Sequence, residues 1–296
     1  MKIRQIAVAA LILVLLLGLA AFVAGTLLTA PHPREIGSLP SNLTGETVEF
    51  PSESGSQIHG WFLPGRASQG VVVVMHGVRA CRLDMLDRAE FLSAGGYAVL
   101  VFDFQAHGES PGKQITFGYL ESRDARAAVA FARSRSPDEK VGVIGVSMGG
   151  AAAMLAEPPL QIDALVLEQV YPALREAIGD RISMRLGNWS RILTPFLSWQ
   201  LGPRLGVRGS ALRPIDHAAK LPSPKLFIGG SADRHTTPAE LEKMFEAAAE
   251  PKELWIVPRA QHVDLCRFGK AEYQTRILEF LSRSLRRVSK PAGTSP

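Results

Sequence analysis

A serine between two glycines stands where a predicted strand passes into a predicted helix. The five residues read Gly145-Val146-Ser147-Met148-Gly149. They follow the apolar run 141–144 and precede the small-residue segment 150–156. A sharp turn in that context exposes the serine hydroxyl, and glycines avoid collisions with the neighbouring strand and helix. The first N–H groups of the helix would face a developing oxyanion. The context therefore predicts that Ser147 is a nucleophile; an idle serine in a glycine-rich junction is the alternative.

An acid and a base follow this serine in the chain, each after a predicted strand. A serine hydroxyl becomes a nucleophile when a base takes its proton, and an acid must orient that base. Asp233 comes after the apolar run 225–228, and His262 comes after the apolar run 253–257. We expect Asp233 to orient His262 and His262 to deprotonate Ser147. Three other histidines are less well placed: His32, His217 and His235. The alternative for His262 is a surface histidine without a catalytic role.

Short apolar runs alternate with helical spacing, which is typical of a parallel sheet covered by helices. The runs are 71–75, 97–102, 141–146, 164–167, 225–228 and 253–257. Between them, the segment 237–240 reads Thr-Pro-Ala-Glu, the pattern of a helix capping box. The segments 46–50 and 57–62 predict an antiparallel hairpin at the sheet edge. The predicted fold class is α/β, with a doubly wound, mostly parallel sheet whose carboxyl edge gathers the candidate catalytic residues.

Four motifs together resemble the α/β-hydrolase superfamily. They are His76-Gly77, the segment 103–110 with the sequence Asp-Phe-Gln-Ala-His-Gly-Glu-Ser, the serine turn at 145–149, and the Asp233/His262 pair. From about Val48 to Leu285 the chain is similar in particular to serine hydrolases related to dienelactone hydrolases and prolyl-oligopeptidase-like enzymes. The resemblance implies an α/β-hydrolase fold with a helical cap insertion and a Ser–His–Asp triad. It is weakly specific for the substrate.

The resemblance also implies an oxyanion hole. In that family the residue after His-Gly and the residue after the nucleophile each contribute a backbone N–H, and these residues are Val78 and Met148 here. The three-glycine loop of many lipases is absent, because residues 78–79 are Val-Arg. Positions 105–106 are Gln-Ala where the family motif Asp-x-Arg-Gly-His-Gly-x-Ser has Arg-Gly. We expect that segment to shape a loop beside the site, so the departure leaves the triad intact.

A long uncharged stretch lies near the start of the chain. Lys2 and Arg4 precede 23 residues without a charged or strongly polar side chain, 6–28. A helix of that length extends over roughly 34 Å and can cross a membrane. A cleaved signal peptide is the alternative, but its apolar stretch is usually about 7–15 residues, and Leu-Thr-Ala at 28–30 is a poor cleavage site. We predict a single-pass signal-anchor in residues 1–30, with the catalytic domain on the non-cytoplasmic side.

Composition sets the remaining boundaries. Pro, Gly, Ser, Thr and Asn dominate residues 31–45, which predicts an irregular linker that lifts the domain off the membrane. The hydrolase domain is expected at 46–285, and 286–296 is expected to be a disordered tail. Within the domain, the segment 172–215 is longer than a crossover helix requires, and the resemblance implies that it forms a cap over Ser147.

The cap segment, residues 172–215, carries a charge of +5, which equals the net charge of the whole chain. Its seven arginines are Arg175, Arg181, Arg185, Arg191, Arg204, Arg208 and Arg213, and its two acids are Glu176 and Asp180. It also holds an apolar cluster: Trp189, Ile192, Leu193, Phe196, Leu197, Trp199 and Leu201. This composition is typical of a helix that touches an anionic membrane surface or an acyl chain. A solvated arginine face over an ordinary packed cap is the alternative.

Composition also excludes several classes of protein. With 46% hydrophobic residues the chain is too apolar to be disordered. Its Cys and His residues lack metal-ligand spacing, and no Lys/Arg block is interleaved with aromatics, so neither a metal nor nucleic acid is expected. Cys81 and Cys266 each lie four residues after a motif residue. Export would let a disulfide between them persist across the mouth of the site, and two independent thiols are the alternative.

The sequence predicts a membrane-anchored serine hydrolase. It would cleave a carboxylic ester of a small or lipid-like molecule through an acyl-enzyme intermediate, without a metal or organic cofactor. A serine peptidase of the prolyl-oligopeptidase-like type is the second candidate. A non-catalytic, membrane-tethered binding domain is the third, and the complete set of triad residues argues against it.

Overall fold

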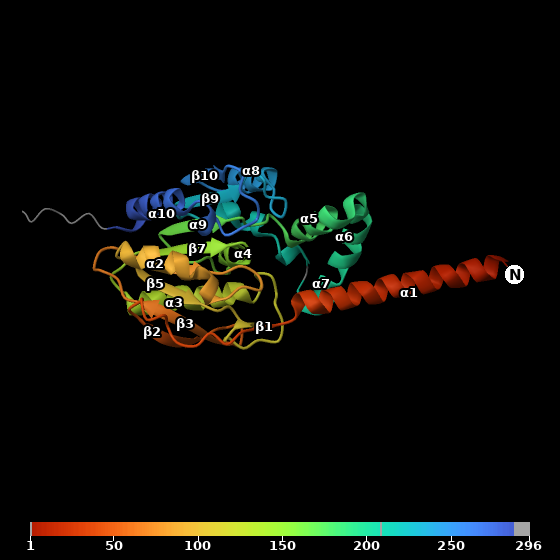
Figure 1. The fold of residues 1–296 in the computed structure, drawn as a ribbon, viewed down its shortest axis with the longest axis horizontal. Helices are drawn as coiled ribbons and strands as arrows, with labels where there is room; N and C mark the ends of the chain where they lie inside the picture. The colour runs from red at the N-terminus through yellow and green to blue at the C-terminus, as the bar shows by residue number, and fades with distance from the viewer. Residues whose placement is uncertain (1, 208, 287–296) are drawn as a thin grey trace, which may run out of the picture.

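An eight-stranded sheet forms the centre of the computed structural model, which describes residues 2–207 and 209–286. Its strands are β2 (Glu46–Pro51), β3 (Gln57–Leu63), β4 (Val71–Met75), β5 (Ala98–Phe102), β7 (Val141–Val146), β8 (Ala164–Glu168), β9 (Lys225–Gly230) and β10 (Lys252–Val257). They lie in the order β10-β9-β8-β7-β4-β5-β3-β2. Only the β2–β3 and β3–β5 pairs are antiparallel. The sheet is therefore doubly wound and mostly parallel with an edge hairpin, as predicted (Figure 1).

The strand order reverses at β4, which lies between β5 and β7. In an open parallel sheet, such a reversal leaves a crevice at the carboxyl ends of the two central strands, because their connections leave toward opposite faces. The carboxyl end of β4 leads into His76-Gly77, and that of β7 leads into Ser147. The topology alone therefore brings the predicted oxyanion loop beside the predicted nucleophile.

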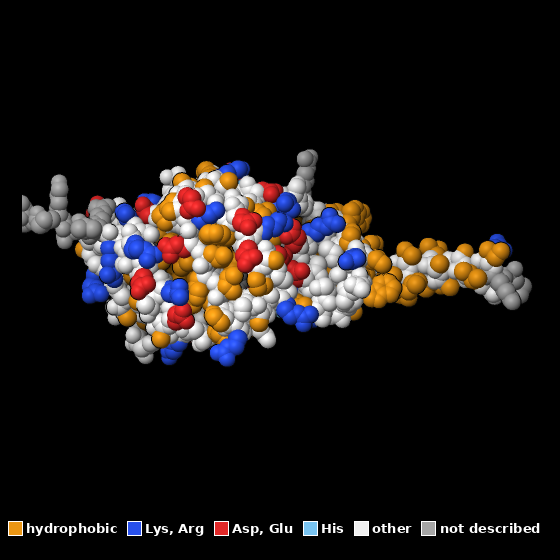
Figure 2. All heavy atoms as spheres, turned by 90° about the horizontal axis from the view of Figure 1, so that it is seen from above, with side chains coloured by type: hydrophobic (Ala, Val, Ile, Leu, Met, Phe, Trp, Pro, Cys, Tyr) orange, Lys and Arg blue, Asp and Glu red, His pale blue; other side chains and the backbone are white. Residues whose placement is uncertain are grey.

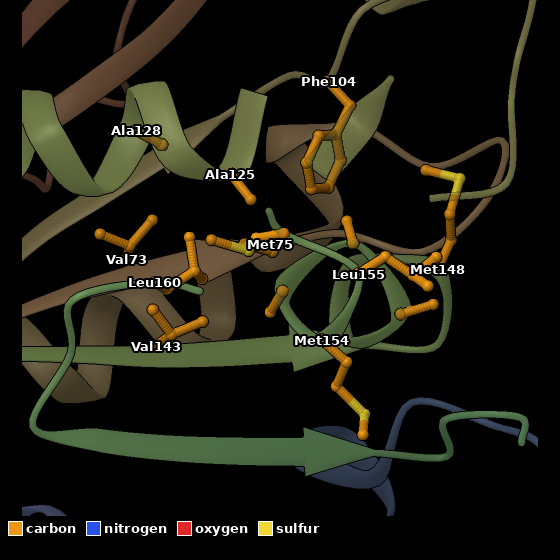
Figure 3. Close-up of a cluster of buried hydrophobic side chains, with 14 of the residues drawn as sticks. Val73, Met75, Phe104, Ala125, Ala128, Val143, Met148, Met154, Leu155 and Leu160 are labelled. Carbon is orange, nitrogen blue, oxygen red and sulfur yellow. The ribbon is translucent and has the colours of Figure 1, made fainter. Parts of the chain in front are cut away.

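Helices cover both faces of the sheet. The helices α3 (Glu121–Arg135), α4 (Met148–Met154) and α8 (Pro238–Ala247) pack on one face, and α2 (Leu86–Ala94), α9 (Leu265–Phe268) and α10 (Lys270–Leu285) pack on the other. Alternate residues of β4 belong to the two cores: Val73 and Met75 to the first, Val72 and Val74 to the second. Because both faces are buried, the strands are continuous apolar runs. Figure 3 shows Met75, at the end of β4, and Met148, the residue after Ser147, as part of the first core.

The long N-terminal helix α1 (Lys2–Thr29) projects away from the domain (Figure 1). Its stretch Ile3–Thr29 is long enough to cross a membrane; the most apolar window of 18 residues within it has a mean hydropathy of 3.1 and is 0% buried. Figure 2 shows the exposed apolar side chains along it. A single helix of this kind near an N-terminus is what both an anchor and a signal sequence produce, so the structure agrees with the predicted helix at 6–28 without choosing between them.

The first residues of the predicted linker, 31–45, are bound to the domain. The short strands β1 (His32–Pro33) and β6 (His107–Gly108) pair in parallel, and the N–H of His32 donates to the Ala106 carbonyl at 2.7 Å. The N–H groups of Ile36 and Gly37 both donate to Glu109 Oε1 at 3.1 Å. Apart from the two residues of β1, the segment 30–45 is irregular, and its backbone docks because its N–H groups find acceptors on the domain.

Helices and 3-10 turns connect β8 to β9 in the predicted cap region. They are α5 (Leu174–Leu186), η2 (Gly187–Trp189), α6 (Ser190–Trp199), α7 (Leu201–Leu205), η3 (Gly209–Ala211) and η4 (Pro214–Lys220). The helices α5 and α6 pack against each other, and α6 contacts α1. Figure 1 shows this layer beside the last turns of α1. Of the predicted features, Arg208 and the tail residues 287–296 lie outside the described residues.

Candidate active site

The serine turn adopts the backbone geometry that the sequence predicts. Ser147 has φ +49° and ψ −110°, between β7 and α4. A Cβ on Gly145 would lie 2.5 Å from Gly150 Cα, and a Cβ on Gly149 would lie 2.5 Å from the Met75 carbonyl oxygen. Both positions therefore require glycine. A non-glycine residue at positive φ is strained, and the surrounding packing must hold it there.

The predicted acid and base lie in contact. Asp233 follows β9 and His262 follows β10, and His262 Nδ1 lies 2.8 Å from Asp233 Oδ2. The Asp233 side chain is fully buried, whereas that of His262 is 20% exposed. Burial tends to raise the pKa of Asp233, but the contact with His262 and two backbone N–H groups outweigh it, so the pKa lies below its usual value. Asp233 therefore stays ionised beside the imidazole.

The nucleophile and the base are not yet hydrogen-bonded. Among the described residues, no hydrogen bond of 3.5 Å or less joins the Ser147 hydroxyl to His262. In unliganded enzymes such contacts are often long and shorten only when substrate is bound. The structure thus brings Asp233 and His262 together and leaves the Ser147–His262 contact to be completed.

The predicted oxyanion residues lie on either side of Ser147. Met148 is the first residue of α4, so its N–H belongs to the helix end that lacks intrahelical acceptors. A Cβ on Gly77 would lie only 3.6 Å from Ser147 Cβ, so the loop that carries Val78 passes close to the nucleophile. His76 fixes that loop: its Nε2 accepts a hydrogen bond from the Phe104 N–H at 3.0 Å, and its Nδ1 lies 2.7 Å from the Gly77 carbonyl oxygen.

A cavity of about 250 Å³ opens over these groups. Ser147, Val78 and Met148 line it together with apolar side chains of the cap, which include Leu174, Ile178, Leu197 and Leu201. The last turns of α1 complete the wall through Gly25, Leu28 and Thr29. Among the residues that the structure describes, three arginines lie in the lining, Arg79, Arg181 and Arg204, and no aspartate or glutamate does. The cavity therefore suits an apolar substrate and disfavours a positively charged one.

Sequence reasoning missed Gln169, which binds the same carboxylate oxygen of Asp233 that His262 contacts. Gln169 Nε2 donates to Asp233 Oδ2 at 3.0 Å and to the Gln261 carbonyl at 2.9 Å. It thus ties the acid loop to the base loop. Its own φ is +53°, and it directly follows β8. Its position at the carboxyl end of a buried strand is the signal that could have identified it.

His235 also belongs to this cluster, although the sequence ranked it below His262. Its ring lies 5.0 Å from the His262 ring at 30°, and its backbone N–H donates to Asp233 Oδ1 at 2.7 Å. Because its side chain does not contact the carboxylate through a hydrogen bond, it packs against the base and does not replace it.

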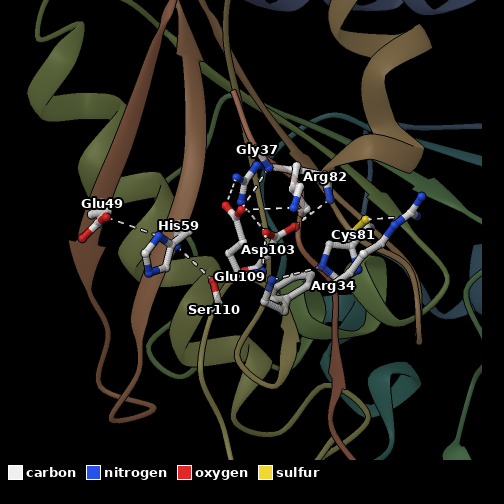
Figure 4. A network of polar contacts seen from close by, with 12 residues as sticks. Arg34, Gly37, Glu49, His59, Cys81, Arg82, Asp103, Glu109 and Ser110 are labelled. Atoms are coloured by element: carbon white, nitrogen blue, oxygen red, sulfur yellow. Dashed lines mark hydrogen bonds and ion pairs between the residues drawn. The ribbon is translucent and has the colours of Figure 1, made fainter. Parts of the chain in front are cut away.

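The departure from the family motif at Gln105 has a local explanation. Gln105 Nε2 donates to Glu121 Oε1 at 2.9 Å and to the Gln114 carbonyl at 2.8 Å. The guanidinium at this edge instead comes from Arg82, which pairs with Asp103 and Glu109 in the buried network of Figure 4. This network binds the motif to the segment after α1 and makes no contact with the triad, in line with the predicted loop-shaping role.

The predicted disulfide is wrong for this structure. Cys81 and Cys266 are both free and buried. β4 and β10 lie three strands apart in the sheet, and although α2 contacts α9, the two cysteines do not bond. Cys81 Sγ instead contacts Asp84 Oδ2 at 3.5 Å, and Cys266 packs in the core on the α2 and α10 face. Burial raises the pKa of both thiols, to about 12 for Cys266, which keeps them protonated.

Fold and site together define the α/β-hydrolase class. The chain belongs to the family described as serine aminopeptidase S33, which it matches over residues 66–213. It is 26% identical over 238 residues to the uncharacterized protein YqkD of Bacillus subtilis, covering 78% of this chain and 77% of that protein. It is 25% identical over 263 residues to WAV2, an alpha/beta hydrolase domain-containing protein of Arabidopsis thaliana, covering 82% and 80%. The Pyrococcus furiosus esterase Pf2001 superposes with a TM-score of 0.70 at 25% identity, over 86% of this chain and 98% of that chain. The chain is thus a hydrolase, and the finer branch named from the sequence stays a prediction.

Two buried histidines beneath the site make the fold sensitive to acid. Burial lowers the pKa of His76 to about 4 and that of His107 to about 4. Between pH 6.5 and 4 the unfolded chain gains these protons and the folded chain does not, so the free energy of unfolding falls as the pH falls, by roughly 3 kcal/mol at most for each histidine. Asp124 acts in the opposite direction, because burial raises its pKa to about 6.

The variant His107→Asn isolates the contribution of one histidine to the pH dependence of the free energy of unfolding. His107 Nδ1 lies 2.9 Å from the Gln105 carbonyl oxygen, and His107→Asn keeps a donor there. We expect urea unfolding to show a smaller loss of stability between pH 6.5 and 4 in His107→Asn than in the parent protein. Equal losses in the two proteins would contradict the neutral, buried His107.

Proposed function

We propose that this chain is a membrane-anchored serine hydrolase that cleaves a carboxylic ester. One observation carries the proposal: Ser147, held at φ +49°, lines a largely apolar cavity together with Val78 and Met148. The contact of Asp233 with His262 on the neighbouring loops supports it. The named esterase Pf2001 among the solved structures agrees with this choice.

The chemistry follows from these positions. His262 takes the proton of the Ser147 hydroxyl as Oγ attacks the ester carbon, and the N–H groups of Val78 and Met148 bind the oxyanion. His262 then gives its proton to the leaving alcohol, which departs from the acyl-enzyme. Water attacks the acyl carbon with His262 as base, and the collapse of this second intermediate releases the carboxylic acid and restores Ser147.

The cavity lining favours an ester over an aminopeptidase substrate, although the family carries the second name. An aminopeptidase must bind a protonated α-amine, and a carboxylate is the group suited to hold it. Arg79, Arg181 and Arg204 line this cavity, and none of its lining residues is acidic. A peptidase and a non-catalytic, tethered binding domain remain the competing functions.

Two esters that differ only at the α-carbon test this choice. One carries a hexanoyl group, the other a 2-aminohexanoyl group, and both have the same leaving alcohol. We expect the amine to lower kcat/KM by about tenfold or more, because its charge must approach three arginines in a poorly hydrated cavity. Preference for the amine would favour the peptidase, and turnover of neither ester would favour the binding domain.

The anchor is the second part of the proposal. The helix α1 is apolar over a membrane-spanning length, and its positive residue Arg4 lies at the end away from the domain. Positive residues stay in the cytoplasm, which assigns the domain to the opposite side.

A further inference from the structure

The last turns of α1 are packed against the cap. Gln200 Nε2 donates to the Ala21 carbonyl at 2.9 Å, and Arg204 donates to the Phe22 carbonyl and, at 2.9 Å, to Thr26 Oγ1. The Arg204 guanidinium also lies over the Phe22 ring, 4.3 Å from its centroid. These contacts give the helix a fixed place beside α6 and α7.

A glycine permits this close approach. A Cβ on Gly25 would lie 2.4 Å from Gln200 Oε1 and 2.7 Å from Arg204 Nε. By contrast, a Cβ on Gly18, two turns earlier, would meet nothing within 4 Å. Gly25 thus packs against the cap, whereas Gly18 on the same helix has no neighbour within 4 Å.

The length of α1 determines how deep the cap must lie. The uncharged stretch begins at Ile6, and crossing about 30 Å of hydrocarbon takes about 20 residues at 1.5 Å each. The hydrocarbon therefore extends to about residue 25. The carbonyls of Ala21 and Phe22, to which the cap is bonded, fall inside that span. If α1 crosses a bilayer, the bonded part of the cap lies at the membrane surface or just within it.

The exposed surface of the cap is apolar, as expected for a surface in contact with a membrane. Large apolar side chains of the cap are 45–77% exposed: Leu186, Trp189, Ile192, Phe196 and Trp199. They lie on α5, η2 and α6, beside the exposed apolar face of α1, and Figure 2 shows apolar side chains gathered where α1 meets the domain. Tryptophan is enriched at membrane–water interfaces, and an exposed apolar patch of this kind marks a contact surface.

The elements that carry this surface, α1 and α6, also line the cavity that contains the nucleophile. Gly25, Leu28 and Thr29 of α1 line the same cavity as Ser147, together with Leu197 and Leu201 of the cap. An acyl chain that leaves the bilayer along α1 reaches these apolar side chains past Gln200 and Arg204, which lie at the contact of α1 with the cap.

We infer that the substrate is a long-chain ester taken from the lipid bilayer. The exposed face of α6 lies in the membrane interface beside α1, and the acyl chain enters the cavity between α1 and α7. This inference rests on the proposed function, because it assumes that α1 is an anchor and that Ser147 is the nucleophile.

Full-length protein in phosphatidylcholine vesicles tests the route. The substrates are a long-chain ester carried in the vesicles and a short-chain ester of the same alcohol dissolved in water. Gly25→Leu should separate α1 from α7 and lower the ratio of long-chain to short-chain turnover by about tenfold or more, because a small displacement at the entry misplaces the chain. Gly18→Leu, the matched control, should leave the ratio unchanged. An unchanged ratio in Gly25→Leu would overturn the inference.

A second measurement tests the membrane placement of the cap even if the Gly25→Leu variant does not insert into the vesicles. The chain has four tryptophans, of which Trp61 and Trp255 are buried in the domain. Brominated lipids should quench the fluorescence of the parent protein, and the Trp189→Phe/Trp199→Phe variant should lose most of that quenching. Equal quenching in both proteins would overturn the membrane placement of the cap. Failure of the parent protein to cleave even the short ester would instead overturn the proposed function.

Discussion

Ser147→Ala should lower kcat/KM for the short-chain ester by roughly 10⁵–10⁶-fold, to the level that binding and the oxyanion N–H groups alone sustain. The fold should survive, because alanine occupies no more space than serine where Ser147 fills a tight turn at φ +49°. Initial-rate kinetics on the purified protein measure the loss, and circular dichroism checks the fold.

Ser134→Ala is the matched control for this substitution. Ser134 is exposed on α3, and its hydroxyl bonds only the Phe131 carbonyl of the same helix. Its activity should equal that of the parent protein. Retention of more than about a hundredth of the activity in Ser147→Ala would exclude this serine as the nucleophile.

Asp233→Asn should lower kcat/KM by about 10⁴-fold, because it removes an acceptor that the cluster cannot replace. Four donors converge on the Asp233 carboxylate. His262 and Gln169 contact Oδ2, and the backbone N–H groups of His235 and Thr236 donate to Oδ1. An asparagine has one acceptor oxygen, and the two backbone donors would hold it at the Oδ1 position.

The amide NH₂ would then face His262 Nδ1. That nitrogen would have to accept, so the ring proton would move to Nε2 and the base could no longer take the proton of Ser147. Asp138→Asn, at an exposed position, is the control. Activity of Asp233→Asn within about tenfold of the parent protein would contradict the assigned orientation of His262.

Local patterns were sufficient to predict the sheet and the serine turn. The apolar runs predicted the six parallel strands, five of which are buried on both faces and have no in–out alternation, whereas β10 lies at the sheet edge. The box at 237–240 begins α8 as expected, with the Thr237 N–H donating to Glu240 Oε2 at 2.8 Å. Gly145 and Gly149 correctly indicated the sharp turn, because close backbone contacts leave no room for a side chain at either position.

Contacts between distant segments could not be predicted in the same way. The clamp by Gln169 depends on the sequence-distant loop after β10, and the free state of Cys81 depends on the strand order. The docking of residues 32–37 on the domain and the place of Gly25 in the cavity wall depend on which surfaces meet. No periodicity or composition encodes such pairings, because they arise from tertiary packing.

Mapping the covalent adduct of a fluorophosphonate tests the central claim most directly. A fluorophosphonate reacts with an activated serine and releases fluoride, and the modified residue is read by mass spectrometry of peptides from the full-length protein. We expect one adduct, on Ser147, that is absent after prior denaturation because an unfolded serine has no oriented base. An adduct on a different serine, or none on the folded protein, would contradict the assignment of Ser147, Asp233 and His262 as a working triad.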